Sequence, residues 1–211
     1  KVNAVTNMRN AVDALKNHPD FNIVNEDIYK TGLIGISTSK ITTKQDDQDA
    51  MLASKLACSH PNFAAQMVVY LVRAGLKSGD TVAIGMTGSF PGANIAMLSA
   101  CKALGIKTVS ISSIGSSAWG ANRIDFTWPH IENYLYKLKF IDSRSIAYSI
   151  GGKNDVGIGQ DDDFNIDVNV IKEIANNFDV DLIEIPLIGD KLNVSKRLDY
   201  YKFNDVDFAA Y

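Results

Sequence analysis

The feature that most constrains the fold is a strand–helix–strand unit between Asp80 and Ser112. "DTVAIGM" has the short apolar run of a buried strand, "PGANIAMLSACKALG" has the length and spacing of a helix, and "KTVSISS" indicates the next strand. Pro91 suits the first helical turn, where its missing N–H costs nothing, and Gly105 suits the position after the last turn. A unit of this kind places its two strands in parallel.

The same alternation of short apolar runs and helical patterns extends along most of the chain. Apolar runs predict strands at 33–36, 81–85, 108–111, 145–149 and 182–185. Helical spacing predicts helices at about 2–17, 48–57, 61–75, 91–104, 128–139, 166–178 and 191–203. Thr127 as N-cap, with Pro129 in the first turn, marks the start of the helix predicted at 128–139. We therefore expect one α/β domain over residues 1–211, a mostly parallel sheet of about five strands with helices on both faces, as in Rossmann-like three-layer folds.

Charge and cysteine content exclude several function classes. The 21 basic and 24 acidic residues give a net charge of −3, so no global basic field exists to attract nucleic acid. No apolar run approaches the roughly 20 residues that span a bilayer. Cys58 and Cys101 lack metal-ligand spacing, and a disulfide between them stays open for an exported domain. We expect neither a cofactor nor a metal.

Ligands of open α/β sheets bind outside the carboxyl ends of the strands, so the loops after the predicted strands are the candidate sites. The first such loop, residues 37–43, holds five hydroxyls and one ammonium within seven residues. These groups could bind a carboxylate or a phosphate, or they could form a solvated turn with local side-chain-to-backbone hydrogen bonds. The candidate ligand residues in this loop are Ser37, Ser39, Lys40, Thr42 and Thr43.

The second loop, residues 87–94, leads directly from a predicted strand into a helix N-terminus. Unpaired N–H groups and the helix dipole favour an anion there, and glycines allow close backbone approach. The pattern is neither GxGxxG nor a Walker A loop, and it is not a GxSxG elbow. The alternative is a tight turn with Ser89 capping the helix. The candidate ligand residues are Thr87, Gly88, Ser89, Phe90, Gly92 and Asn94.

The third loop, residues 112–122, is rich in small side chains that leave room for a ligand. Trp119 offers a flat apolar surface beside them, although a loop tryptophan can equally be a lid over the core. The candidate ligand residues here are Ser116, Trp119 and Asn122.

The fourth loop, residues 151–159, has four glycines in nine residues, which implies positive φ angles or tight packing. Its candidate ligand residues are Gly151, Gly152, Lys153 and Asp155. The acidic run 161–163 most simply begins the next helix, where carboxylates favour the dipole. The spacing lacks the pattern of an EF-hand, so no metal site is assigned.

A hydrolase could be assembled from these loops, but no spacing singles one out. Its nucleophile would be Ser89 or Ser116, its base His60 or His130, and the residue that orients the base Asp125 or Asp155. Either histidine could equally solvate a helix end. No catalytic residue is assigned from the sequence.

Several strings, taken together, resemble the poly-gamma-glutamate system protein family. The most telling are "NFAA" at 62–65, "TGSFPGAN" at 87–94 and "SSAWGA" at 116–121, and "GGKNDVGIG" and "LNVSKRLDYY" also fit the family. The resemblance covers roughly residues 31–200. One departure is "DDQ" at 46–48, where the family pattern leads us to expect a Gly-containing stretch.

The resemblance implies a role beside the machinery that makes or exports poly-γ-glutamate, an anionic capsule polymer. Family members carry an N-terminal membrane segment, which would account for a chain that begins at Lys1. The expected location is thus at a membrane, through a segment outside this chain, on the extracytoplasmic side. The expected partners are membrane proteins of polymer synthesis or export and an anionic small molecule or polymer, and a homo-oligomer is left open.

Three functions follow as hypotheses. The first is an accessory component of capsule synthesis or export that binds glutamyl or phosphoryl groups at the strand-to-helix loops. The second is a hydrolase or transferase that acts on poly-γ-glutamate or on a phosphorylated precursor. The third is a non-catalytic structural partner of membrane capsule subunits, which docks through the aromatic tail Tyr200–Tyr211.

Overall fold

The computed structural model describes residues 1–19, 23–44, 47–159, 166–184, 190–202 and 206–211, the side chains of 190–193 excepted. Over these residues the chain forms seven helices: α1 (Val2–Lys16), α2 (Gln48–Ser59), α3 (Asn62–Arg73), α4 (Pro91–Leu104), α5 (Trp128–Lys137), α6 (Val168–Asn176) and α7 (Asp190–Lys202). None of the helices in this described part combines the length and apolarity needed to cross a membrane.

The sheet has four strands, all parallel. Its strands are β1 (Thr81–Thr87), β2 (Lys107–Ser113), β5 (Ala147–Ser149) and β6 (Asp181–Ile183), in the order β1-β2-β5-β6. Thr87 pairs with Ser113, Ser113 with Ser149, and Ser149 with Ile183, so the four carboxyl ends lie level. A separate short hairpin joins β3 (Asn122–Arg123) to β4 (Phe126–Thr127). This confirms the predicted α/β class with a parallel sheet.

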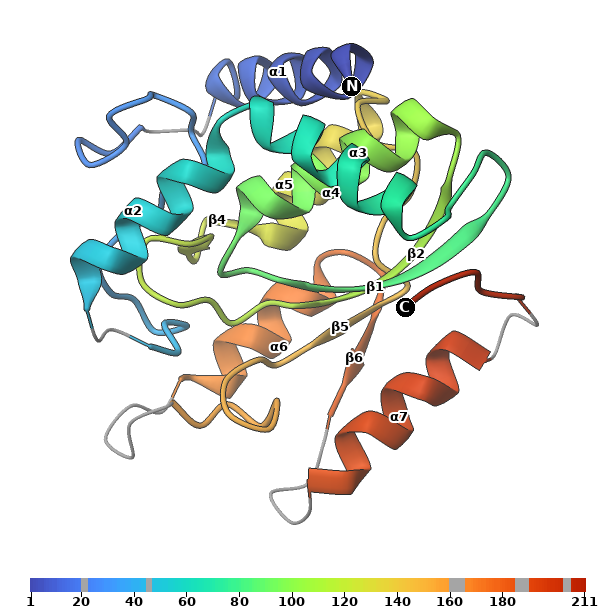
Figure 1. The fold of residues 1–211 in the computed structure, drawn as a ribbon. Coiled ribbons are helices and arrows are strands. Elements are labelled where there is room, and N and C mark those ends of the chain that lie inside the picture. Colours follow the sequence, from blue (N-terminus) through green and yellow to red (C-terminus); the bar gives the residue numbers. More distant parts are fainter. Residues whose placement is uncertain (20–22, 45–46, 160–165, 185–189, 203–205) are drawn as a thin grey trace.

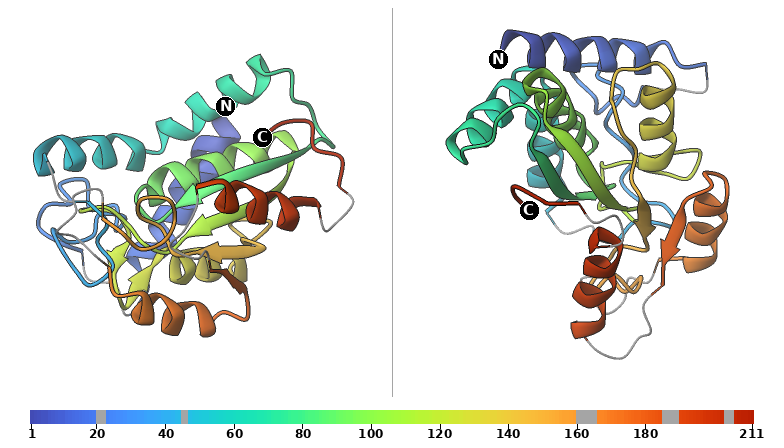
Figure 2. Two further views of the ribbon diagram at one scale, coloured as in Figure 1. Left: turned by 90° about the horizontal axis from the view of Figure 1, so that it is seen from below. Right: turned by 90° about the vertical axis from the view of Figure 1, so that its right-hand side faces the viewer.

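Helices cover both faces of the sheet (Figures 1 and 2). On one face, Val82 and Met86 of β1 pack in the main core with α3, α4 and α5, and α1 lies outside α3 and α4. Tyr148 of β5 belongs to a second cluster with α6. On the opposite face, Ala83 and Ile111 pack against Tyr201 of α7. The arrangement is a three-layer α/β fold.

The signals at the helix ends are confirmed. Pro91 stands in the first turn of α4, and Gly105 ends that helix at φ 70°. Thr127 caps α5 through a capping box in which His130 is the third helical residue. Both cysteines are free thiols, so the disulfide that the sequence left open is not formed, and burial raises the pKa of Cys101 to about 12.

One predicted strand is wrong, and the sheet has four strands instead of about five. Residues 33–36 form no strand; residues 33–35 are buried, and the segment pairs with the loop after β2 and not with the sheet. The Gly35 N–H donates to the Trp119 carbonyl at 3.1 Å, and the Ile36 N–H donates to Asn122 Oδ1 at 2.9 Å. An apolar run predicts burial, but it does not say which backbone will complete the hydrogen bonds.

The described part of the aromatic tail packs on the chain's own sheet. The Ala209 N–H donates to the Thr81 carbonyl at 2.8 Å, and the Ala83 N–H donates to the Ala210 carbonyl at 3.0 Å. Tyr201, only 4% exposed, donates from its hydroxyl to the Ile84 carbonyl. Figure 1 shows this C-terminal segment beside β1. Docking of the tail on a partner, the third hypothesis, stays a prediction; of the described tail, Tyr211 is the aromatic residue that is largely exposed.

A buried carboxyl joins α5 to the sheet. Glu132 is 0% exposed and accepts hydrogen bonds from the Ser145 hydroxyl at 2.8 Å and the Tyr148 hydroxyl at 3.0 Å. Ser145 Oγ lies 2.6 Å from Ser112 Oγ, which accepts from the Trp128 indole N–H. Burial raises the pKa of Glu132, and the two hydroxyl donors offset this only in part.

Glu132→Gln is expected to remove a pH dependence of stability. The folded state holds the Glu132 proton more tightly than the unfolded state does. The protonated carboxyl therefore contributes fully to stability below the ordinary pKa of 4.5, and this contribution is lost as pH rises through the pKa of the folded state. Within that window the wild type should lose about 1.4 kcal/mol per pH unit relative to Glu132→Gln. Urea unfolding from pH 4 to 9 measures it, with exposed Glu173→Gln as control. Parallel curves for wild type and Glu132→Gln would contradict the expectation.

Candidate functional site

The four candidate loops converge on one cavity of about 600 Å³ beyond the carboxyl ends of the strands. Its wall comprises Thr43 and Lys44 from the first loop, Thr87, Ser89 and Phe90 from the second, Ser113, Gly115 and Ser117 from the third, and Gly151, Gly152, Asn154 and Asp155 from the fourth, together with Met51, Lys55, Met86 and Arg197. Parallel strands with level ends explain the convergence, because each loop leaves the sheet at the same rim.

Seven of the residues singled out from the sequence lie in this wall: Thr43, Thr87, Ser89, Phe90, Gly151, Gly152 and Asp155. The remaining candidates lie outside its described part, and most of them have structural roles. Each loop therefore contributes a small polar surface to the cavity and uses its other residues to hold itself in place.

The first loop is held by a polar knot. The Ser39 hydroxyl donates to the Asn122 carbonyl at 2.5 Å, and the Asn122 amide donates to the Ile36 carbonyl at 2.7 Å and to Thr42 Oγ1 at 3.0 Å. Thr42 is 1% exposed and Asn122 is 0% exposed, so neither can reach a ligand. Ser37 and Lys40 lie outside the described cavity wall, and Lys40 is exposed.

In the second loop, the glycines serve packing and not ligand approach. A Cβ on Gly88 would lie 2.8 Å from the Ile114 carbonyl oxygen, and one on Gly92 would lie 2.8 Å from the Cys58 carbonyl oxygen. The buried Asn94 amide donates to the Thr87 carbonyl at 2.9 Å. The residue at the N-cap of α4 is Phe90, which makes no side-chain cap, so the alternative of Ser89 as the cap is wrong.

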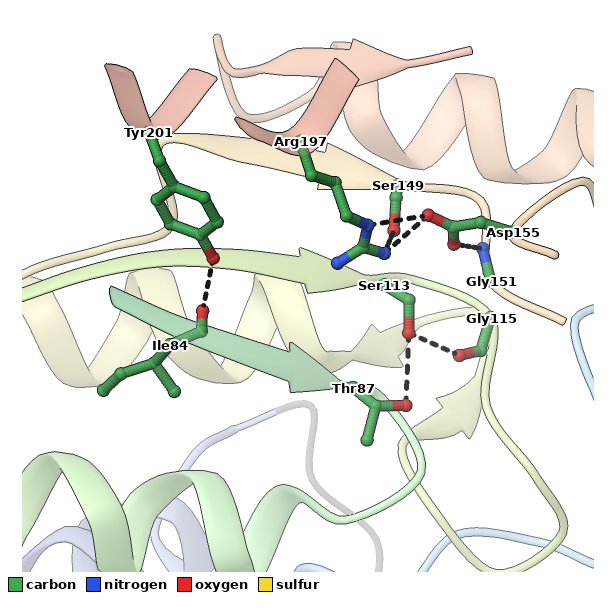
Figure 3. A network of polar contacts seen from close by, with 9 residues as sticks. All are labelled: Ile84, Thr87, Ser113, Gly115, Ser149, Gly151, Asp155, Arg197 and Tyr201. Atoms are coloured by element: carbon green, nitrogen blue, oxygen red, sulfur yellow. Dashed lines mark hydrogen bonds and ion pairs between the residues drawn. The ribbon is translucent and has the colours of Figure 1, made fainter. Parts of the chain in front are cut away.

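The third loop contributes residues that the sequence did not single out. Ser116 is 0% exposed, with its hydroxyl donating to the Ser117 carbonyl. Trp119 has φ 63°, and its indole nitrogen is buried with no partner among the described residues. The lining residues are instead Ser113, Gly115 and Ser117. Figure 3 shows the Ser113 hydroxyl between Thr87 and Gly115, with Thr87 Oγ1 at 3.1 Å.

An ion pair holds the fourth loop. Asp155 Oδ1 accepts from the Gly151 N–H at 2.8 Å, and Oδ2 lies 2.5 Å from the Arg197 guanidinium (Figure 3). Arg197 also donates to Ser149 Oγ at 2.9 Å. Gly151 and Gly152 have φ 91° and 79°, as the glycine content predicted. Lys153 is exposed outside the described wall, and the acidic run 161–163 lies outside the described residues.

The strongest electrostatic feature of the cavity is Lys55, on α2. It is 2% exposed, and its Nζ donates to the Ser89 carbonyl at 2.6 Å and to Ser117 Oγ at 2.8 Å. The ammonium also lies 4.2 Å from the centre of the Phe90 ring. Burial lowers the pKa of Lys55 to about 8, and the Cys58 thiol opposes this only in part. Among the described residues no carboxylate forms an ion pair with it.

The cavity carries a positive excess. Its described wall contains three cationic side chains, Lys44, Lys55 and Arg197, and one carboxylate, Asp155. The residues that supply this charge were missed from the sequence because two of them stand on helices, outside the loops. One signal was present: Lys55 is the single charge in the nine-residue run "MLASKLACS" on a predicted helix. A lone charge among apolar residues is a candidate for burial, and a buried polar group is the informative exception in a core.

The catalytic groups considered from the sequence do not meet. His130 Nδ1 accepts from the Thr127 N–H at 3.2 Å in the α5 cap, and burial lowers its pKa. His60 Nδ1 accepts from the Asn62 N–H at a helix start. Neither histidine lines the described cavity, so a histidine triad built on Ser89 or Ser116 is wrong.

Compared with known proteins, the chain matches no family model, no curated protein and no solved structure. The chemistry of the cavity is therefore the physical basis for assigning a function.

Proposed function

We propose that this protein binds a ligand bearing carboxylate or phosphoryl groups in the cavity at the carboxyl ends of its strands. The observation that carries the proposal is Lys55, a buried ammonium held by one carbonyl and one hydroxyl. Burial of a cation without a counter-charge is unfavourable, and an anion beside it recovers part of that free energy. Lys44 and Arg197 in the same wall add to the attraction.

We further propose that the ligand is a glutamyl or poly-γ-glutamyl group and that the protein is an accessory component of poly-γ-glutamate capsule synthesis or export. Support comes from the family resemblance of the loop sequences and from the polymer itself, which carries a free carboxylate on every residue. In this proposal a segment outside this chain holds the domain at a membrane. The domain then acts on the extracytoplasmic side, beside the membrane proteins of synthesis or export.

Calorimetric titration with poly-γ-glutamate, glutamate and inorganic phosphate tests the anion site. We expect millimolar or tighter binding of at least one at pH 7, and Lys55→Met should abolish it. Lys102→Met is the matched control, because Lys102 is paired with Asp142 at a distance from the cavity. No heat from any of the three anions at millimolar levels would contradict the proposal.

Binding of poly-γ-glutamate should also depend on pH. The free protein holds the Lys55 pKa at about 8, and a bound carboxylate favours the ammonium form. Affinity should therefore be constant below pH 8 and fall by up to about tenfold per pH unit above it, while the carboxylates of the polymer stay ionised. An affinity that is unchanged between pH 7 and 10 would show that Lys55 does not contact the anion.

The second hypothesis, a hydrolase or transferase that acts on the same ligand, is favoured by one specific observation. The Lys55 ammonium lies 2.8 Å from the hydroxyl of Ser117, in the wall of the anion cavity.

A further inference from the structure

We propose that Ser117 is a nucleophile and Lys55 its general base, so that the cavity cleaves or transfers an acyl group of its ligand. The proposal rests on the proposed function in one respect: the acyl substrate is expected to carry a carboxylate, which Lys44 and Arg197 attract while Lys55 is neutral. It differs from the sequence-based enzyme hypothesis in both residues, since that hypothesis had Ser89 or Ser116 as nucleophile and a histidine as base.

The two reacting groups are within hydrogen-bond distance. Lys55 Nζ and Ser117 Oγ are 2.8 Å apart, and both residues line the cavity. Flanking backbone bonds fix the serine: the Ser117 N–H donates to Ser89 Oγ at 2.9 Å, and the Ala118 N–H donates to the Lys44 carbonyl at 2.9 Å. A nucleophile and base held in this way are pre-organised for proton transfer.

Lys55 has the environment of a lysine base. Its pKa of about 8 means that a substantial fraction is neutral near that pH. The ionisable groups around it are the Cys58 thiol on the same helix and, in the cavity wall, Lys44, Arg197 and Asp155. The neutral amine can keep one N–H on the Ser89 carbonyl while its lone pair accepts the Ser117 proton.

The other hydroxyls beside the cavity lack a base. Ser89 Oγ accepts the Ser117 N–H, and Ser116 is 0% exposed with its hydroxyl on a backbone carbonyl. Ser113 donates to Thr87 Oγ1. Among the described lining residues, Ser117 is thus the one serine whose hydroxyl is hydrogen-bonded to a group that can take its proton.

The reaction is an acyl transfer from an amide. Ser117 Oγ forms a bond to the carbonyl carbon while its proton passes to Lys55 Nζ. The carbon–nitrogen bond then breaks, and Lys55 returns the proton to the leaving amine, which leaves an acyl ester on Ser117. Water attacks the ester, Lys55 takes a proton from the water, and the released Ser117 oxygen recovers it. An amine in place of water gives transfer. A γ-linked amide with a neighbouring carboxylate is the substrate class that the charge of the cavity fits.

A fluorophosphonate probe tests the nucleophile, because this neutral reagent phosphonylates an activated serine and needs no carboxylate site. We expect mass spectrometry to place the adduct on Ser117, with a labelling rate that rises with pH to a plateau above about 8. Ser117→Ala should abolish labelling, and Ser54→Ala should leave it unchanged, because Ser54 is exposed on α2 with its hydroxyl on Met51.

Lys55→Arg separates the base from the cation. Arginine keeps the positive charge but does not lose its proton in proteins, so labelling should fall at least about 100-fold while poly-γ-glutamate still binds within about tenfold. Circular dichroism confirms that each variant is folded. Absence of a Ser117 adduct between pH 7 and 10 in the folded wild type, or labelling of Lys55→Arg at the wild-type rate, would overturn the proposal.

Failure of the nucleophile and failure of the anion site give different results. Binding of poly-γ-glutamate by the wild type without any Ser117 adduct leaves the anion site and removes the nucleophile. A Ser117 adduct in a protein that binds none of the tested anions removes the proposed function and leaves the nucleophile.

Discussion

Asp155→Ala is expected to lower the free energy of unfolding by about 3 kcal/mol. The side chain of Asp155 is 6% exposed, and its carboxylate is the described ion-pair partner of Arg197. Its removal takes the described counter-charge from the guanidinium, which is itself only 20% exposed, and it leaves the Gly151 N–H without the carboxylate that accepts its hydrogen bond. Urea denaturation followed by circular dichroism measures the change.

A double-mutant cycle assigns the effect to the pair. Arg197→Met alone strands the buried carboxylate and should also destabilise, whereas the double variant strands neither charge. The double variant should therefore be at least about 1 kcal/mol more stable than the sum of the single effects allows. A loss below about 1 kcal/mol for Asp155→Ala would show that the ion pair does not hold the glycine-rich loop.

Lys55→Met is expected to have the opposite effect and to stabilise the protein while it removes anion binding. The fall of the Lys55 pKa from 10.5 to about 8 corresponds to about 3 kcal/mol of desolvation. Methionine has a similar shape, but it leaves the Ser89 carbonyl without its donor, a loss of about 1 kcal/mol. The net gain of about 2 kcal/mol should raise the melting temperature at pH 7 by about 6 °C.

The sign of the pH dependence distinguishes this explanation from better packing. The ammonium destabilises the folded state fully below pH 8, and the unfolded state loses the same proton only near pH 10.5. The stability of the wild type relative to Lys55→Met should therefore rise between pH 8 and 10.5, and the advantage of the variant should shrink. Thermal unfolding at pH 7, 9 and 10.5 measures it; an advantage that is constant with pH would exclude desolvation as its cause.

Sequence patterns were sufficient to predict the α/β fold and its parallel sheet. The unit from Asp80 to Ser112 carried its own strand runs, its helix start at Pro91 and its stop at Gly105, all local signals that the tertiary structure left unchanged. Because parallel strands end at one rim, the gathering of four distant loops around one cavity also followed from the pattern. The strand predicted at 33–36 was wrong because the hydrogen-bond partners of this segment, Trp119 and Asn122, are more than 80 positions away.

The charges of the candidate site were harder to foresee. Arg197 comes from α7, which crosses the far face of the sheet, and no loop-based search includes it. Lys55 becomes part of the candidate site only when the folded loops place the Ser89 carbonyl and the Ser117 hydroxyl beside it. The glycines at 88 and 92 were conspicuous in the sequence, yet close contacts with Ile114 and Cys58 explain them, and sequence alone cannot distinguish packing from ligand approach.

The pairing of residues 209 and 210 with the outer side of β1 has a consequence for self-association. An open border of a sheet is a template on which a second copy can add its own strand. Here the carbonyl of Thr81 and the amide of Ala83 are already occupied by the chain's own last residues, and Tyr201 occupies the carbonyl of Ile84. The first strand is thereby closed to intermolecular pairing along this stretch.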